Sequence, residues 1–221
     1  FILSGLLGSA FGRYFKYLGF DRVGVSVSRS IVNSQPFFAT IIAIAILGER
    51  LTLPAGIGTS IIIFGIAVIS QSEEKTRKWK RRWLLFPLFS AFCLGTSTVI
   101  DKIGLNIFPS PILGATISVS AALSAYMFFF ILSGRAKATS VNRCGLSLFC
   151  GAGICEGGAI LCMYYALSLG TVILVSPLIN TSPLFALFFS YTFLKDVEKV
   201  TRKIVVAAIL IVIGATIITF Y

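Results

Sequence analysis

Long apolar stretches separated by short polar segments make up most of the chain. Six stretches carry no charged residue: 30–48, 51–72, 83–100, 103–134, 157–194 and 204–221. A helix needs about 20 mostly apolar residues to cross the roughly 30 Å hydrocarbon core of a bilayer. Membrane-barrel strands would instead alternate apolar and polar residues, which runs such as Ile61–Phe64 do not. The pattern predicts an all-α integral membrane protein.

The stretch over 157–194 is too long for one span, because its 38 residues would form a helix of about 57 Å. We place a reversal at Ser168–Thr171, where Gly170 permits a turn, and a loop at 106–111. The prediction is eight helices over about 1–19, 25–48, 52–70, 83–101, 111–133, 145–167, 172–194 and 203–221.

Composition and charge agree with lipid as the solvent. Apolar residues make up 57% of the chain and charged residues 12%, against roughly a quarter charged in soluble domains. The net charge is +11, but the 19 basic residues are spread over short loops. This distribution does not indicate a nucleic-acid groove. Most positive charge falls in or beside 20–24, 71–82, 134–144 and 195–203, so the positive-inside rule predicts that these loops are cytoplasmic.

The sequence indicates neither a metal site nor a cofactor. Its five cysteines form no CxxC pair, and it has no histidine. We interpret the cysteines as small apolar side chains. The sequence contains no phosphate-binding loop motif, so nothing in it points to ATP hydrolysis. The chain begins at Phe1 with an apolar segment unlike a signal peptide, and we expect an N-terminal piece to precede it.

Two parts of the chain repeat each other. Residues 14–48 align with 161–195 at an offset of 147, which becomes 149 after a two-residue insertion. The matched pairs include Tyr17 with Tyr164, Asn33 with Asn180, Pro36 with Pro183, Glu49 with Glu198, and Thr52 with Thr201. The copies lie five predicted spans apart, and an odd number reverses their orientation. Inverted repeats of this kind are common in secondary transporters, whose solute site lies near the midplane between the halves.

Short motifs in both copies are similar to a known family. A helix containing Pro36 is followed by Gly48-Glu49-Arg50-Leu51-Thr52, Gly58 and Ile61-Ile62-Ile63-Phe64-Gly65, and Tyr164-Tyr165-Ala166-Leu167 opens the second copy. These motifs resemble the EamA repeat of the drug/metabolite transporter superfamily. The second copy departs from it, with Val197-Glu198-Lys199-Val200-Thr201 in place of the Gly-Glu-Arg pattern.

The resemblance implies ten helices in two halves of five, of which this chain would hold the third to the tenth. Residues 1–70 would then be the last three helices of the first repeat, 71–82 a basic linker, and 83–221 the complete second repeat. The superfamily includes transporters of amino acids, nucleotide sugars, sugar phosphates and drug-like compounds. The resemblance therefore implies transport without identifying a solute.

Each copy carries a polar Asn-x-x-Pro segment near the middle of a predicted helix. Proline lacks an N–H and displaces the carbonyl four residues back, so the freed backbone needs partners other than lipid. Paired breaks point to a transport site, although the amides could instead only bond neighbouring helices. The candidate substrate-binding residues are Asn33, Gln35, Pro36, Asn180, Ser182 and Pro183, with Tyr17 and Tyr164 as cavity-lining residues. Tyr164 could instead be an interfacial anchor.

Glu156 is the one carboxylate that we place inside a predicted span, because Asp101 falls at a predicted helix end beside Lys102. A charge at the bilayer centre is costly, so it usually faces a cavity or a cation. Glu156 is therefore a candidate for proton coupling or cation binding. The alternatives are a structural ion pair with Arg29 or Arg13, or a shallower position in the membrane.

The leading hypothesis is a multi-pass cell-membrane protein that carries or exports a small polar or amphipathic metabolite by alternating access. Its partners would be the solute, membrane lipid and, through Glu156, protons. Without histidine, and with one predicted intramembrane acid, the chain shows no nucleophile–base set, so we expect no enzymatic activity. A structural or lipid-handling membrane protein, or an intramembrane enzyme, is the alternative.

Overall fold

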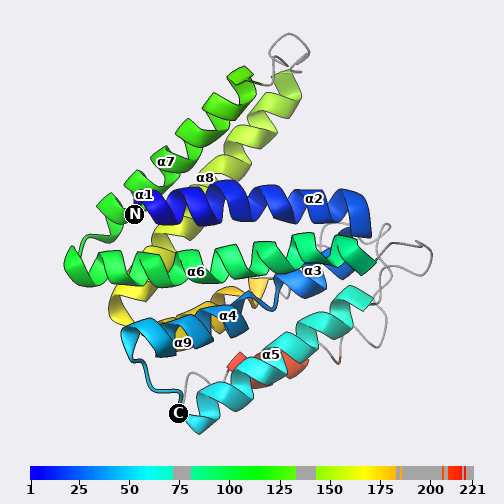
Figure 1. Ribbon diagram of the computed structural model, residues 1–221, viewed down its shortest axis with the longest axis vertical. Coiled ribbons are helices and arrows are strands. Elements are labelled where there is room, and N and C mark those ends of the chain that lie inside the picture. Colours follow the sequence, from blue (N-terminus) through cyan, green and yellow to red (C-terminus); the bar gives the residue numbers. More distant parts are fainter. Residues whose placement is uncertain are drawn as a thin grey trace.

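The protein is a bundle of helices in the computed structural model (Figure 1). The structure describes residues 1–71, 81–132, 143–182, 185, 206, 209–215 and 217. Every regular element in this part of the chain is helical, which confirms the predicted fold class. Three helices within it are long and apolar enough to cross a membrane: Arg82–Ile107, Pro111–Leu132 and Phe149–Leu169.

The first helical rod is continuous and longer than predicted. It consists of α1 (Ile2–Ser4), the π-helical η1 (Gly5–Gly12) and α2 (Arg13–Val23). The predicted end near residue 19 is too early, because the rod stops only at Gly24, whose φ of 100° is a conformation that other residues rarely adopt.

Small residues bring this rod close to α6 (Leu85–Ile107), which follows the short η3 (Arg81–Leu84). The Ser97 hydroxyl donates to the Ser4 carbonyl over 3.0 Å, and the Ser90 hydroxyl donates to the Gly12 carbonyl over 2.7 Å. Small residues and interhelical hydrogen bonds are the usual means by which helices associate in lipid.

The helix predicted over 25–48 forms with a break in its middle. It consists of α3 (Val25–Val32), α4 (Gln35–Ile42) and the π-helical η2 (Ala43–Leu47). Asn33 and Ser34 separate α3 from α4, and the whole element ends at Gly48, in a left-handed conformation with φ of 66°. After a short link, α5 (Leu53–Gln71) follows.

Helix α6 is followed by α7 (Pro111–Leu132), α8 (Arg143–Leu169) and α9 (Val172–Ile179), and residues 209–215 are helical as well. The predicted end of α6 at residue 101 is wrong, since α6 continues to Ile107. The sequence suggests that Asp101 and Lys102 leave the lipid, but both find polar partners on or just after α8 and stay within the helix. The predicted reversal before α9 is confirmed at Gly170–Thr171.

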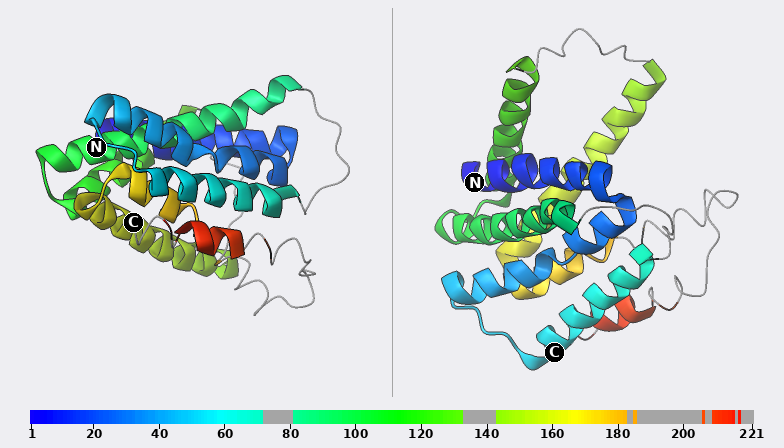
Figure 2. Two further views of the ribbon diagram at one scale, coloured as in Figure 1. Left: turned by 90° about the horizontal axis from the view of Figure 1, so that it is seen from below. Right: turned by 45° about the vertical axis from the view of Figure 1, so that its right-hand side comes forward.

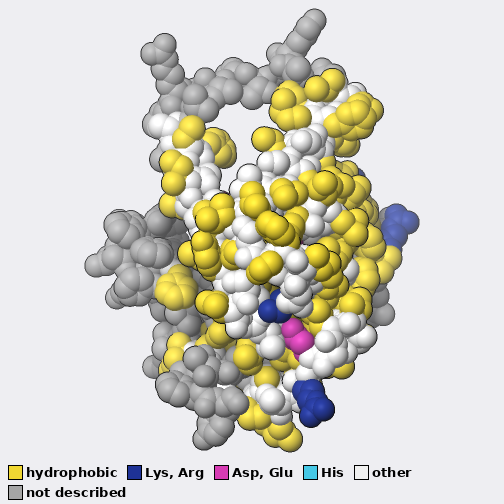
Figure 3. Space-filling model, turned by 90° about the vertical axis from the view of Figure 1, so that its left-hand side faces the viewer, with side chains coloured by type: hydrophobic (Ala, Val, Ile, Leu, Met, Phe, Trp, Pro, Cys, Tyr) yellow, Lys and Arg dark blue, Asp and Glu magenta, His cyan; other side chains and the backbone are white. Residues whose placement is uncertain are grey.

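In the bundle, α6 lies between the first rod and α4 (Figure 1). Helices α4 and α9 pack side by side and run in opposite directions, as the two further views also show (Figure 2). The outer parts of α7 and α8 extend away from the body and expose many apolar side chains (Figure 3). In the 18-residue apolar stretch of α7 only 17% is buried inside the bundle, and in that of α8 only 11%. Such low burial suits helices that contact lipid.

Candidate functional site

The two helix breaks predicted from the sequence have the same local geometry. Asn33 has φ −70° and ψ −4°, and Asn180 has φ −75° and ψ 2°. The Ser34 hydroxyl donates to the carbonyl three residues back over 2.6 Å, and the Thr181 hydroxyl does the same over 2.7 Å. Ser34 and Thr181 are related by the offset of 147 found in the sequence. The two breaks therefore share the same local backbone turn.

The packing of α4 on α9 brings the breaks to one end of the helix pair. Helix α4 begins just after its break, whereas α9 ends just before its own. Because the two helices run in opposite directions, the start of α4 lies on the same side as the end of α9 (Figure 1). The antiparallel packing of α4 and α9 thus puts the two polar breaks at the same end of the helix pair.

The side chains at the breaks differ in their hydrogen bonding and burial. Asn33 and Gln35 are partly buried, and their amides make no hydrogen bond to another described residue. Asn180 donates to the Ser176 carbonyl over 2.8 Å. Ser182 is exposed, and Pro36 is fully buried. Pro183 lies outside the described residues.

A second polar group, missed from the sequence, lies between α6 and α8. The Tyr164 hydroxyl donates to Oδ1 of Asp101 over 2.6 Å, and the two residues are 1% and 3% exposed. The buried side chains of Ser4 and Ser118 are their other polar neighbours. The sequence did contain one signal that the helix continues past Asp101. No proline follows Asp101 and Lys102 until Pro109, so nothing there forces the helix to end.

The turn between α8 and α9 is held by two charged side chains. Lys102 donates to the Leu167 and Gly170 carbonyls over 2.7 and 2.8 Å. The Glu49 carboxylate accepts from the N–H groups of Val172 and Ile173 over 2.9 and 3.1 Å. Each charge has the sign that complements its helix end. The sequence motif around Glu49 therefore marks the cap of a helix in the other repeat.

The chain matches the EamA-like transporter family over residues 1–71 and 81–220. It belongs to that family. No curated protein matches it. Sixteen chains of solved structures do, and one, titled only "Crystal structure of protein", has a TM-score of 0.80 at 16% identity over 98% of this chain and 76% of its own. That likeness shows the fold alone, while the family match makes this a membrane protein of a transporter family.

In this EamA protein, Glu156 lies on an exposed face of α8. It accepts a hydrogen bond from Nη2 of Arg13 on α2 over 2.6 Å, with the two side chains 55% and 36% exposed. This contact is the ion pair with Arg13 that the sequence left open as an alternative. The role of Glu156 in proton coupling stays a prediction.

The matched tyrosines have different surroundings. Tyr164 is buried against Asp101, whereas Tyr17 is 58% exposed on α2, beside Phe20 and Lys16. The repeat therefore gives the two positions the same residue but not the same neighbours, and the structure does not bring them into one site.

The described residues form an open, apolar groove of about 580 Å³. It is lined by Phe15, Phe38, Leu85, Phe86, Leu88, Phe89 and Phe92, from α2, α4 and α6. None of the polar candidates lines it. The groove can accommodate an acyl chain or an apolar part of a solute, but it offers a polar solute no hydrogen bond.

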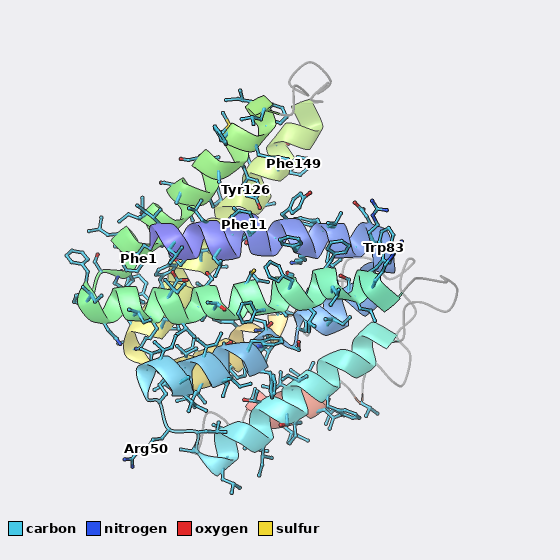
Figure 4. All side chains as sticks on the ribbon, in the orientation of Figure 1. Phe1, Phe11, Arg50, Trp83, Tyr126 and Phe149 are labelled. Carbon is cyan, nitrogen blue, oxygen red and sulfur yellow. The ribbon has the colours of Figure 1, made fainter. Side chains whose placement is uncertain are left out.

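The two ends of the bundle carry different basic residues. At one end the Arg22 guanidinium lies 4.2 Å from the centre of the Trp83 ring, so the segment 20–24 and η3 meet there. Arg50 lies at the opposite end, beyond η2 (Figure 4).

Proposed function

We propose that this EamA protein is a secondary transporter that moves a small polar or amphipathic metabolite by alternating access. The observation that carries the proposal is the pair of matching breaks, at Asn33–Ser34 and Asn180–Thr181, beside the antiparallel helices α4 and α9, which pack together. Half-helices meeting near the middle of a membrane supply unpaired backbone groups for a solute.

The proposed solute site uses groups for which the described part of the chain supplies no partner. The amides of Asn33 and Gln35 can each donate and accept hydrogen bonds, and the Ser176 hydroxyl is buried without a partner among the described residues. Pro36 fixes the start of α4 and removes one backbone donor. We place the solute between these groups, with the breaks as hinges between two packing arrangements.

The proposal includes the arrangement in the membrane. The protein crosses the cell membrane several times, residues 1–70 end the first repeat, 71–82 link the repeats, and 83–221 form the second repeat. Lipid covers the exposed faces of α7 and α8. Proton coupling is part of the proposal, with Glu156 as the carboxylate suggested by the sequence and a second candidate argued below.

The test is solute counterflow into liposomes that contain the purified full-length protein. A thermal-shift screen over amino acids, nucleotide sugars, sugar phosphates and cationic amphiphiles selects the solutes. We expect at least one stabilising solute to exchange across the bilayer faster than in protein-free liposomes. If solutes stabilise the protein but none of them exchanges across the bilayer, the proposed transport would be contradicted. Redistribution of labelled phospholipid without solute exchange would favour a lipid-handling protein, which the apolar groove also fits.

A further inference from the structure

The most buried carboxylate among the described residues is Asp101, and four helical elements enclose it. Ser4 of α1 and Tyr164 of α8 are its polar neighbours on α6, and Ser118 of α7 in turn neighbours the Tyr164 hydroxyl; all four side chains are less than a tenth exposed. The Tyr164 hydroxyl donates directly to Asp101 over 2.6 Å. A carboxyl group is thus held inside the fold by hydroxyl groups.

The charged side chains at the neighbouring α8–α9 turn are engaged elsewhere. The Lys102 ammonium is bound to the Leu167 and Gly170 carbonyls. The Glu49 carboxylate is bound to the α9 N-terminus. Among the described side chains, Ser4 of α1 and Tyr164 of α8 are the polar groups that face Asp101, and from α7 the Ser118 hydroxyl is a neighbour of Tyr164. No side-chain cation forms an ion pair with Asp101 in the described part of the chain.

This position suits a group that changes charge. Without a cationic side chain, an ionised carboxylate in such a site has a high free energy, and protonation relieves it. Protonation also changes the hydrogen bond to Tyr164, three residues before Leu167, whose carbonyl Lys102 holds. A proton on Asp101 therefore acts on the same end of α8 that leads into α9 and its break.

We infer that Asp101, positioned by Tyr164, is the proton-binding site that couples transport to a proton gradient. The inference rests on the proposed function. An aqueous proton forms an O–H bond with the Asp101 carboxylate in one conformation, and the acid returns that proton to water in the other. Asp101 is preferred over Glu156, because Glu156 is exposed and already paired with Arg13.

Infrared difference spectroscopy of the purified full-length protein tests proton binding without any solute. On acidification from alkaline pH, the wild type should gain a carboxylic-acid C=O band that Asp101→Asn lacks. The band should persist in Glu156→Gln, and Tyr164→Phe should shift its frequency and titration. A band unchanged in Asp101→Asn, or one lost in Glu156→Gln, would overturn the assignment. If Asp101→Asn does not fold, Asp101→Glu and Tyr164→Phe decide: an unshifted titration in both overturns it.

Liposome assays separate this inference from the proposed function. With a solute identified by the screen, Asp101→Asn should keep counterflow but lose accumulation driven by an imposed pH gradient. Full gradient-driven accumulation by Asp101→Asn would overturn the coupling role and leave transport intact. Absence of counterflow in the wild type would instead overturn the proposed function, while the infrared result would still show whether Asp101 binds a proton.

Discussion

Glu49 and Lys102 hold the same turn from its two sides. The Glu49 carboxylate bonds the first N–H groups of α9, and the Lys102 ammonium bonds carbonyls at the end of α8 and in the turn. Because Glu49 follows the broken helix of the first repeat and Lys102 lies on α6, the turn of the second repeat is tied to both. Movement of α9 relative to α4 must either carry this turn along or break these bonds.

Removing the Glu49 cap should destabilise the protein. Glu49→Ala leaves two N–H groups of α9 without a partner, and loss of a cap with its charge costs about 1–2 kcal/mol. Thermal unfolding in detergent should show a lowered midpoint. Arg50→Ala is the matched control, because Arg50 is exposed beside it. Adding Lys102→Met should give a double-mutant effect that is not the sum of the single ones. Additive effects would contradict a shared role in the turn.

Substitution at glycine should be tolerated or not according to the space around it. A Cβ at Gly8 would collide with the side chain of Ser97, so Gly8→Ala should lower the free energy of unfolding by about 1–3 kcal/mol. A Cβ at Gly153 meets no described atom within 4 Å. Gly153→Ala should therefore be neutral or stabilise by up to about 1 kcal/mol through helix propensity. Equal midpoint shifts in the two variants would contradict the close approach of η1 to α6.

The asparagines at the breaks should matter more for solute binding than for folding. Asn33→Ala removes an amide without a described partner, so it should unfold like the wild type but bind the screened solute about tenfold more weakly, the size of one hydrogen bond. Asn180→Ala should weaken binding similarly and cost some stability, since Asn180 bonds the Ser176 carbonyl. Asn106→Ala, at an exposed position, is the control. Normal counterflow in both variants would show that these amides only join helices.

The basic loops should be cytoplasmic. The loops 20–24, 71–82, 134–144 and 195–203, with the adjacent Arg29, hold 15 of the 19 basic residues, and the opposite side holds Arg50 and Lys102. The contact of Arg22 with Trp83 places the segment 20–24 and η3 at one end of the bundle. In a cysteine-free background, a single cysteine next to Lys78 should react with a membrane-impermeant reagent only after the membrane is opened. Labelling in intact cells would reverse the orientation.

The sequence predicts the helices and breaks well, because lipid imposes length and apolarity on every span, and proline acts on the backbone locally. The fully buried Pro36 illustrates this, since the break stands directly before it. The burial and the hydrogen-bond partners of the polar side chains could not be predicted. The sequence suggests that a helix ends at Asp101. Its hydrogen-bond partner, Tyr164, lies 63 residues away in the chain, so only the packing reveals the pair. Tyr17 and Tyr164 are equivalent in the repeat, yet only the packing shows that one is buried and the other exposed.

The last prediction distinguishes the two carboxylates on α6 and α8. Glu156 and Arg13 form an exposed pair, and such pairs contribute about 0–1 kcal/mol, so Glu156→Gln and Arg13→Gln should each change the unfolding midpoint little. If Asp101 is the coupling residue, Glu156→Gln should also keep the pH dependence of transport. The comparison is gradient-driven uptake in Glu156→Gln and Asp101→Asn, measured with the same solute. Loss of pH dependence in Glu156→Gln alone would return the coupling role to Glu156. Unfolding of Glu156→Gln, reversed when Arg13 is neutralised as well, would show instead that the ion pair is structural and stronger than its exposure suggests.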